Sequence, residues 1–175
     1  MWEHFLAAWN EAHFFLHSTV TLASDIDIFT DALSTVGFGG YFKGSWFCDK
    51  WPVELDSQHN DDLCMALLEL YLIVVAAMLW GTQWSQHRIS FNCDNFATVH
   101  IIRKGRASSH CCIINKLLRW LTLLAMQHNF VFLAHHLPGA HNGIADSLSR
   151  FQFQRFRLLA PAAQQHKTQC PLFYR

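Results

Sequence analysis

The chain has 175 residues, of which 51% are hydrophobic and only 15% are charged, a composition that excludes intrinsic disorder and fits one domain with short flanks. Its formal net charge of +0 conceals an asymmetry, because residues 1–94 hold 12 acids and 3 bases, whereas residues 95–175 hold 1 acid and 10 bases. A basic second half leaves room for a polyanionic partner, and the alternative is chance patterning of solvated helix faces.

The spacing of the cysteines and histidines limits the redox and metal chemistry that can be expected. None of the 6 cysteines forms a Cys-x-x-Cys motif, and most of them lie in apolar runs, as is typical of buried thiols in an intracellular protein of the cytoplasm or nucleus. The 12 histidines show no His-Glu-x-x-His spacing, and no zinc site is expected. The N-terminus lacks a basic segment and is a poor signal peptide.

The first part of the chain predicts a flank followed by three strands. Residues 1–24 form the flank, which we expect to be the connection to a preceding domain. Strands are predicted over residues 26–31, 37–43 and 45–51, with a tight turn at Lys43-Gly44-Ser45. Sequential strands with so short a connection favour an antiparallel meander.

A long apolar segment over residues 62–80 predicts a helix that Asp61 and Asp62 cap. The segment is apolar nearly all round, which is typical of a helix buried on more than one side. It is long enough to cross a membrane. Glu69 near its middle and the absence of basic flanks argue against that, so we expect no membrane partner.

The second half of the domain alternates strands and helices. A strand is predicted over 88–93, helices over 95–104 and after Ser108-Ser109, a strand over 130–135 and a last helix over 142–150. The order βββαβααβα predicts an α/β domain over residues 25–150, with a five-stranded mixed sheet and helices on both faces. Residues 151–175 are polar and basic and are expected to form a tail outside the core.

Four acids stand where folding alone does not favour a carboxylate. Asp31 and Asp94 end apolar strands, Glu69 lies inside the apolar helix, and Asp146 is the one acid after residue 94. Because the carboxyl ends of neighbouring parallel strands lie together, we expect Asp31 beside Asp94, with Glu69 and Asp146 facing the same crevice. Turn and capping roles are the alternatives for Asp31, Asp94 and Asp146, but Glu69 has no comparable structural explanation.

A cluster of four carboxylates is typical of a site that gathers divalent cations, since the acids would otherwise repel one another. Hard oxygen ligands favour Mg²⁺ or Mn²⁺ over zinc. Two such ions about 4 Å apart can clamp the attacking and leaving oxygens of a phosphodiester, which points to a nucleic-acid strand as the substrate.

Short motifs around these acids resemble one known family. The motifs are Phe29-Thr30-Asp31-Ala32, Gly37-Phe38-Gly39-Gly40, Glu69-Leu70-Tyr71, Cys93-Asp94-Asn95 and the whole of residues 136–150. Over residues 24–150 the chain looks like the ribonuclease H domain of a retrotransposon polyprotein, and it is most similar to those of DIRS-like, tyrosine-recombinase-type elements. The resemblance implies a ribonuclease H-like fold and cleavage of the RNA strand of an RNA–DNA hybrid with two Mg²⁺ or Mn²⁺ ions.

The resemblance also implies roles for single residues. Asp31, Glu69, Asp94 and Asp146 would ligate the metal ions. His136 would be the histidine of a mobile loop, assisting proton transfer or product release, with His135 as its rival. Strand periodicity turns the His135 side chain to the opposite face, where we expect it to act mainly on stability.

A further set of residues is expected to contact the nucleic acid. Its members are Gly37, Gly39, Asn95, Arg103, Lys104, Arg106 and Asn142. The glycines would let backbone approach the minor groove, and the basic side chains would contact phosphates or form a solvated face. Asn95 would bind a ribose hydroxyl or cap a helix.

The resemblance implies a reverse transcriptase domain of the same polyprotein as a partner, but the chain contains no Tyr-x-Asp-Asp motif. It looks cut from a longer polyprotein or encoded by a truncated copy. An alternative function therefore stays open, namely a catalytically weak or inactive ribonuclease H-like module that binds nucleic acid or a polymerase.

Overall fold

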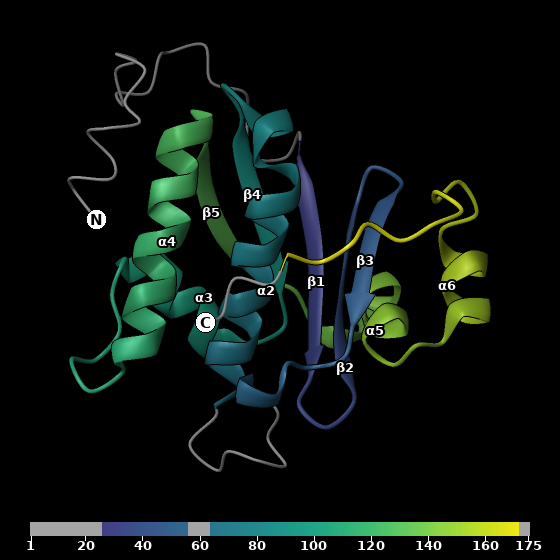
Figure 1. Ribbon diagram of the computed structural model, residues 1–175, viewed down its shortest axis with the longest axis horizontal. Coiled ribbons are helices and arrows are strands. Elements are labelled where there is room, and N and C mark those ends of the chain that lie inside the picture. The colour runs from purple at the N-terminus through teal and green to yellow at the C-terminus, as the bar shows by residue number, and fades with distance from the viewer. Residues whose placement is uncertain (1–25, 56–63, 172–175) are drawn as a thin grey trace.

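A five-stranded mixed sheet lies at the centre of the computed structural model, which describes residues 26–55 and 64–171 (Figure 1). Its strands are β1 (Asp27–Leu33), β2 (Gly37–Phe42), β3 (Ser45–Asp49), β4 (Arg88–Cys93) and β5 (Val131–His136), arranged in the order β3-β2-β1-β4-β5. The first three strands are antiparallel neighbours, whereas β4 pairs in parallel with both β1 and β5. The predicted α/β class and mixed sheet are confirmed.

The helices follow the predicted order with one addition. They are α2 (Met65–Trp80), α3 (Phe96–Lys104), α4 (Cys112–His128), α5 (Gly143–Ser149) and the unpredicted α6 (Phe153–Leu159), with short 3-10 turns at Val53–Leu55, Gly81–Trp84 and Gly139–His141. Cys64 is the N-cap of α2, and the predicted caps Asp61 and Asp62 lie outside the described residues, as does the predicted flank 1–24. The helix predicted after Ser108-Ser109 begins at Cys112, and its N-cap is Cys111 in place of the predicted serines.

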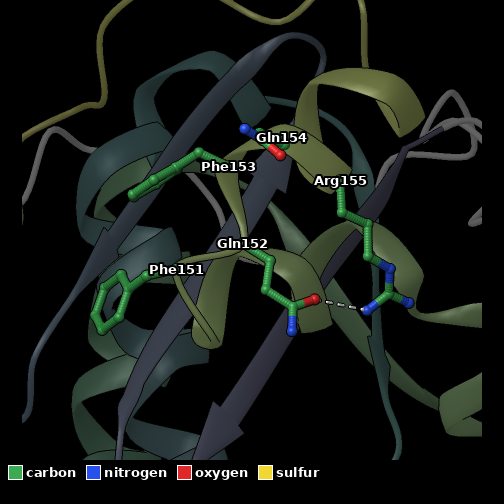
Figure 2. Close-up of a pocket in the computed structure, with 5 residues that line it drawn as sticks. All are labelled: Phe151, Gln152, Phe153, Gln154 and Arg155. Atoms are coloured by element: carbon green, nitrogen blue, oxygen red, sulfur yellow. Dashed lines mark hydrogen bonds between the residues drawn. The ribbon is translucent and has the colours of Figure 1, made fainter.

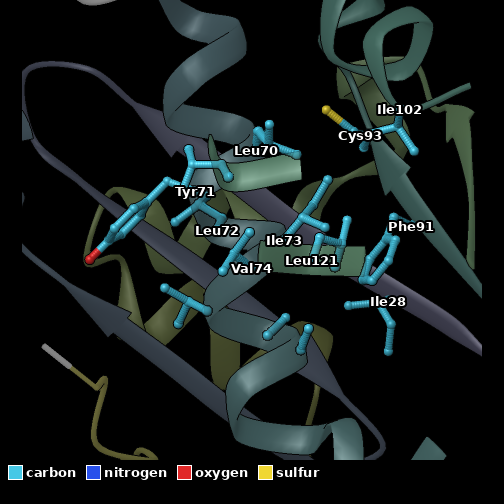
Figure 3. Close-up of a cluster of buried hydrophobic side chains, with 14 of the residues drawn as sticks. Ile28, Leu70, Tyr71, Leu72, Ile73, Val74, Phe91, Cys93, Ile102 and Leu121 are labelled. Atoms are coloured by element: carbon cyan, nitrogen blue, oxygen red, sulfur yellow. The ribbon is translucent and has the colours of Figure 1, made fainter. Parts of the chain in front are cut away.

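Helix α2 is the core element of the domain. Its central residues Leu70, Leu72 and Ile73 have no exposed surface, and they pack with β1 and β4 side chains such as Ile28 and Phe91 (Figure 3). By length and composition alone, Met65–Trp84 could cross a membrane, but 78% of its most apolar stretch is buried inside the domain. Packing on every side therefore explains why this helix is apolar all round.

The two faces of the sheet carry different helices. Phe38 of β2 packs edge-on against Tyr71 of α2, with ring centroids 6.0 Å apart. The next residue, Gly39, faces α5 so closely that a Cβ atom there would lie 2.4 Å from the Cβ of Leu148. Because successive side chains of a strand point to opposite faces, α2 and α5 lie on opposite sides of the sheet.

The segment after residue 150 packs against the sheet instead of forming a tail, so that expectation is wrong for residues 151–171. Phe156 and Ala160 are buried in a second apolar cluster with Trp46, Cys48 and Leu148. The Trp46 carbonyl accepts a hydrogen bond from the Thr168 N–H at 2.8 Å. Helix α6 thus covers the β3 side of the molecule, away from α4 (Figure 1). Its spaced phenylalanines form an apolar face that a polar average composition conceals.

We expect Phe156→Ala to lower the free energy of unfolding by about 3–5 kcal/mol, as for other fully buried phenylalanines. Leu158→Ala on the same helix is the matched control, because Leu158 is 83% exposed and its loss should change stability by no more than about 0.5 kcal/mol. Urea denaturation of both variants measures the difference. Equal midpoints for Phe156→Ala and the wild type would show that α6 does not contribute to the core.

Candidate metal site

The carboxyl ends of β1 and β4 bring Asp31 and Asp94 together. The two strands are parallel, with Phe29 opposite Asn92, so the same offset places Asp31 alongside Asp94 two residues later. Asp31 is only 7% exposed, and its burial raises the pKa of its carboxyl, with the nearby charges of Asp94 and Asp146 adding to the rise. The predicted adjacency at this edge of the sheet therefore holds.

Glu69 reaches the same place from α2. Its side chain has no exposed surface, its Oε1 accepts a hydrogen bond from the Ala32 N–H at 3.0 Å, and its Oε2 lies 3.6 Å from the Cys93 Sγ. Burial, followed by the charges of Asp31 and Asp94, raises the pKa of Glu69 well above its ordinary value. No ion pair within the described part of the chain involves Glu69. A buried acid without a cationic partner favours a cation as its missing neighbour.

The donor atoms of this cluster suit a hard divalent ion. One ligand atom each from Glu69, Cys93 and Asp94 lies within 4.8 Å of the others. Burial raises the pKa of the Cys93 thiol far above its ordinary value, so the sulfur stays protonated at neutral pH and donates to Glu69. Carboxylate oxygens are therefore the candidate ligands, and they are the donors that Mg²⁺ and Mn²⁺ prefer.

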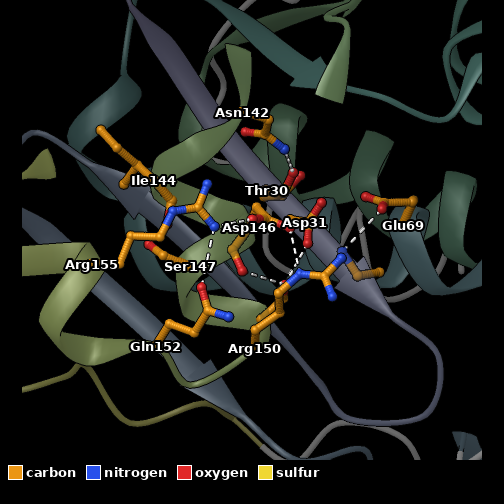
Figure 4. A network of polar contacts seen from close by, with 12 residues as sticks. Thr30, Asp31, Glu69, Asn142, Ile144, Asp146, Ser147, Arg150, Gln152 and Arg155 are labelled. Atoms are coloured by element: carbon orange, nitrogen blue, oxygen red, sulfur yellow. Dashed lines mark hydrogen bonds and ion pairs between the residues drawn. The ribbon is translucent and has the colours of Figure 1, made fainter. Parts of the chain in front are cut away.

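Asp146 joins the acids from α5, but two arginines hold it. Its Oδ1 accepts from the Arg150 Nε at 2.6 Å and its Oδ2 from an Arg155 terminal nitrogen at 2.5 Å (Figure 4). Burial alone would raise the pKa of Asp146, but the hydrogen bonds and charges of both arginines outweigh it and lower the pKa. Since each carboxylate oxygen already accepts a hydrogen bond from an arginine, a metal ion at Asp146 would compete with both guanidinium groups for its negative charge.

Helix α5 also fixes Asp31. The Ser149 hydroxyl is fully buried and lies 2.5 Å from the Asp31 Oδ2, and it stands three residues after Asp146 on the same helix. Neither Ser149, Arg150, Arg155 nor Cys93 was expected at the site. Helical i,i+3 and i,i+4 spacing from Asp146 is a signal that could have found Ser149 and Arg150. No sequence spacing points to Arg155, because it reaches the site through a separate helix.

His136 lies beside Asp94, at the end of β5. Its Nε2 is 3.1 Å from the Asp94 carbonyl oxygen, and its ring contacts Phe96 with centroids 5.4 Å apart. The strand extends one residue further than the sequence predicts, so His136 belongs to β5 and not to the following loop. His135 pairs with Asn92 and its side chain is exposed, so burial adds no support to a mainly stabilising role, which stays a prediction.

Three of the residues expected to contact nucleic acid have packing roles instead. Asn142 is 1% exposed, and its Nδ2 donates to the Thr30 carbonyl at 2.9 Å, which ties the start of α5 to β1. A Cβ at Gly37 would lie 2.6 Å from the Phe151 ring, and Gly39 meets Leu148 as described above. The missing side chains therefore admit α5 and the segment after it, and the buried backbone is not open to a minor groove.

The remaining candidates surround α3. Asn95 caps this helix, since its Oδ1 accepts from the Thr98 N–H at 3.0 Å, and the capping interpretation is confirmed. Arg103, Lys104 and Arg106 are exposed around its C-terminus. The Arg103 Nε donates to the Ala134 carbonyl at 3.0 Å, so part of this side chain holds β5. Phosphate contacts by these three residues stay a prediction.

No protein-family model, no curated protein sequence and no solved structure matches the chain. The function therefore has to be argued from the acids, their surroundings and the motifs that contain them. The convergence of Asp31, Glu69 and Asp94, with Asp146 one helix away, is the strongest of these observations.

In metal-free protein kept in EDTA, Glu69→Gln is expected to raise the free energy of unfolding at neutral pH. The folded state raises the pKa of Glu69 above its ordinary 4.5, so stability is fully present below 4.5 and is lost as the pH rises toward the folded pKa. Glutamine does not titrate, so the difference between the two proteins should widen as the pH rises. Urea denaturation across the pH range measures it.

Added Mg²⁺ gives the complementary test. At a concentration 100-fold above its Kd it should stabilise the wild type by about 2.7 kcal/mol, and Glu69→Gln by clearly less. A variant that is less stable than the wild type in EDTA at neutral pH, and equally stabilised by Mg²⁺, would make Glu69 a structural partner and not a ligand.

Proposed function

We propose that the chain is a metal-dependent endonuclease of the ribonuclease H type, which cleaves the RNA strand of an RNA–DNA hybrid. The observation that carries the proposal is the buried Glu69 carboxylate near Asp31 and Asp94, at the end of two parallel strands, which has no cationic partner among the described residues. The motifs that resemble the family surround these same residues. The mixed sheet, with its order β3-β2-β1-β4-β5, is compatible with a ribonuclease H-like fold.

In this proposal Asp31, Glu69, Asp94 and Asp146 hold two Mg²⁺ or Mn²⁺ ions, which when bound supply an activated water and charge stabilisation at the departing oxygen. The chain's own groups prepare these ligands. The Ala32 N–H and the Cys93 thiol orient Glu69, and the Ser149 hydroxyl orients Asp31. The proposal gives His136 the role of moving a proton near Asp94, whose carbonyl oxygen lies 3.1 Å from the imidazole Nε2.

The substrate side of the proposal concerns the exposed bases. Arg103, Lys104 and Arg106 at the end of α3, with Lys116 and Arg119 on the exposed face of α4, are the proposed contacts to hybrid phosphates. A reverse transcriptase domain of the same polyprotein is the proposed partner. It would deliver the hybrid that the site cleaves.

One observation favours a second candidate, an inactive module that binds nucleic acid or a polymerase. Both oxygens of Asp146 are held by arginines, and one oxygen of Asp31 is held by Ser149, which are arrangements that suit a permanently metal-free site. Failure of Mg²⁺ and Mn²⁺ to change thermal stability would support this candidate. Because no cationic side chain among the described residues pairs with Glu69, its carboxylate is left for a metal ion, and we favour the nuclease.

The wild type is expected to cleave the RNA strand of a labelled hybrid with Mg²⁺ or Mn²⁺ and to lose that activity in EDTA. Glu69→Gln and Asp94→Asn should each lower turnover by orders of magnitude, because each removes a charge that the ions need. Gel analysis of the labelled strands measures cleavage. Equal cleavage of single-stranded DNA, or activity that survives chelation, would exclude the assignment.

His136→Ala is expected to lower kcat by roughly 10- to 1,000-fold, at or just below the usual range for general acid–base catalysis. Metal affinity should stay close to that of the wild type, because carboxylates and not imidazole hold the ions. His135→Ala is the matched control, since the neighbouring side chain is also exposed but lies on the other face of β5. One steady-state assay compares both variants. Loss of turnover in the control alone would move the proton-transfer role to His135.

A further inference from the structure

An open groove lies beside the acid cluster, on the segment that follows α5. It has a volume of about 480 Å³ and is lined by residues 151–155 (Figure 2). The rings of Phe151 and Phe153 point to one side of this groove and the Arg155 guanidinium to the other, with the amide of Gln152 between them. The volume falls within the range of about 300–1,000 Å³ that small-molecule sites occupy.

The aromatic side of the groove is exposed but held in place. Phe153 is 44% exposed, and its ring lies 6.1 Å from the Trp46 ring and 6.3 Å from the Phe151 ring. Phe151 has a φ of 55°, a left-handed conformation that bulky residues rarely adopt. This turn directs the Phe151 ring onto Gly37, where the absent Cβ leaves room for it. The Phe153 ring is therefore partly exposed to solvent while it packs against the rings of Trp46 and Phe151.

The charged side of the groove is connected to the candidate metal site. The same Arg155 nitrogen that pairs with Asp146 lies 3.2 Å from the Gln152 Oε1. Asp146 is the last acid of the chain, and residues 147–175 hold 5 bases and no acid. A cation bound at Asp146 would weaken the attraction between Asp146 and Arg155, because both positive charges then share one carboxylate. The guanidinium would be less fully neutralised and suited to a phosphate.

We propose that this groove binds one unpaired nucleotide of a strand that extends from the hybrid, with its base on the Phe153 ring and its phosphate on Arg155. The inference rests on the proposed nuclease function and deepens it by naming the form of the substrate. A base must be unpaired to offer its face to a ring, and such stacking tolerates every base because each has a π face. The side-chain amide of Gln152 is placed to reach the edge of that base.

The test compares blunt RNA–DNA hybrids with hybrids that carry a single-stranded extension on either strand and at either end. Fluorescence anisotropy in Mg²⁺ measures Kd, with Ca²⁺ in place of Mg²⁺ wherever the substrate is cut, so that every proposed metal ligand is kept. One extension should tighten binding about 5- to 150-fold, the equivalent of 1–3 kcal/mol per stacked base. Phe153→Leu keeps the apolar volume without the ring and should lose this gain, whereas Phe153→Tyr should retain it. Arg155→Gln should lose part of it.

Two controls separate the groove from general effects. Leu158→Ala removes an exposed apolar side chain from α6. Lys43→Gln removes an exposed charge in the turn after β2, near the end of β1 that lies away from Asp31. Neither variant should change the gain in affinity that the extension gives. The subsite would be overturned if no extension tightened binding to the wild type. It would also be overturned if Phe153→Leu kept the full gain in affinity. If blunt hybrid is still cleaved in that case, the proposed nuclease function stands. A wild type that neither binds nor cleaves any hybrid would overturn both.

Discussion

The burial of one carboxylate is the constraint on which the candidate site depends. Glu69 lies on a helix whose neighbouring residues are enclosed on all sides, so its side chain cannot turn toward solvent. Removing a carboxylate from water costs several kcal/mol, of the order known for buried ions, and one backbone N–H with one thiol offsets little of it. Protonation lowers this cost in the metal-free protein, which is the physical meaning of the raised pKa. A divalent cation would lower it more.

The acids approach this place from both sides of the sheet. Glu69 comes from α2, whereas Asp31 turns toward α5, where Ser149 meets it. Asp146 belongs wholly to the α5 side and is controlled by Arg150 and Arg155. The site therefore lies at the end of the sheet, where two helical layers supply opposite kinds of environment. On the α2 side, Glu69 has no positively charged partner among the described residues. On the α5 side, Asp146 pairs with two arginines, so the positive charge around it exceeds its own negative charge.

The charge asymmetry of the chain is largely resolved by local contacts. Arg150 and Arg155 neutralise the last acid, and Arg157 donates to the carbonyls of Ala163, Gln164 and Gln165. Arg103 donates to the backbone of β5. A basic half therefore does not by itself form a surface for a polyanion. The basic surface that a polyanionic partner could contact is narrower, namely the end of α3, the exposed face of α4 and the Arg155 guanidinium.

Local patterns predicted the sheet and the meeting of Asp31, Glu69 and Asp94, because strand alternation and the crossover topology depend on sequence order. They did not predict the role of residues 151–171. Phe153 and Phe156 are separated by Gln and Arg, so the composition of the segment indicates a polar tail. Only the three-residue spacing of the phenylalanines on a helix shows that they share one face. The packing of Asn142 on Thr30 and the pairing of Arg155 with Asp146 join distant or separately placed elements, which no local spacing encodes.

These contacts move the functional boundary of the domain beyond the last helix that the sequence predicted. A chain ending at residue 150 would expose Trp46 and Leu148, which α6 covers, and would lose the backbone bond between Thr168 and β3. It would also leave Asp146 with Arg150 alone. The charge environment of Asp146 is therefore set in part by Arg155, which belongs to a segment outside the motifs that resemble the family. Stability and site electrostatics depend here on the same seven-residue helix.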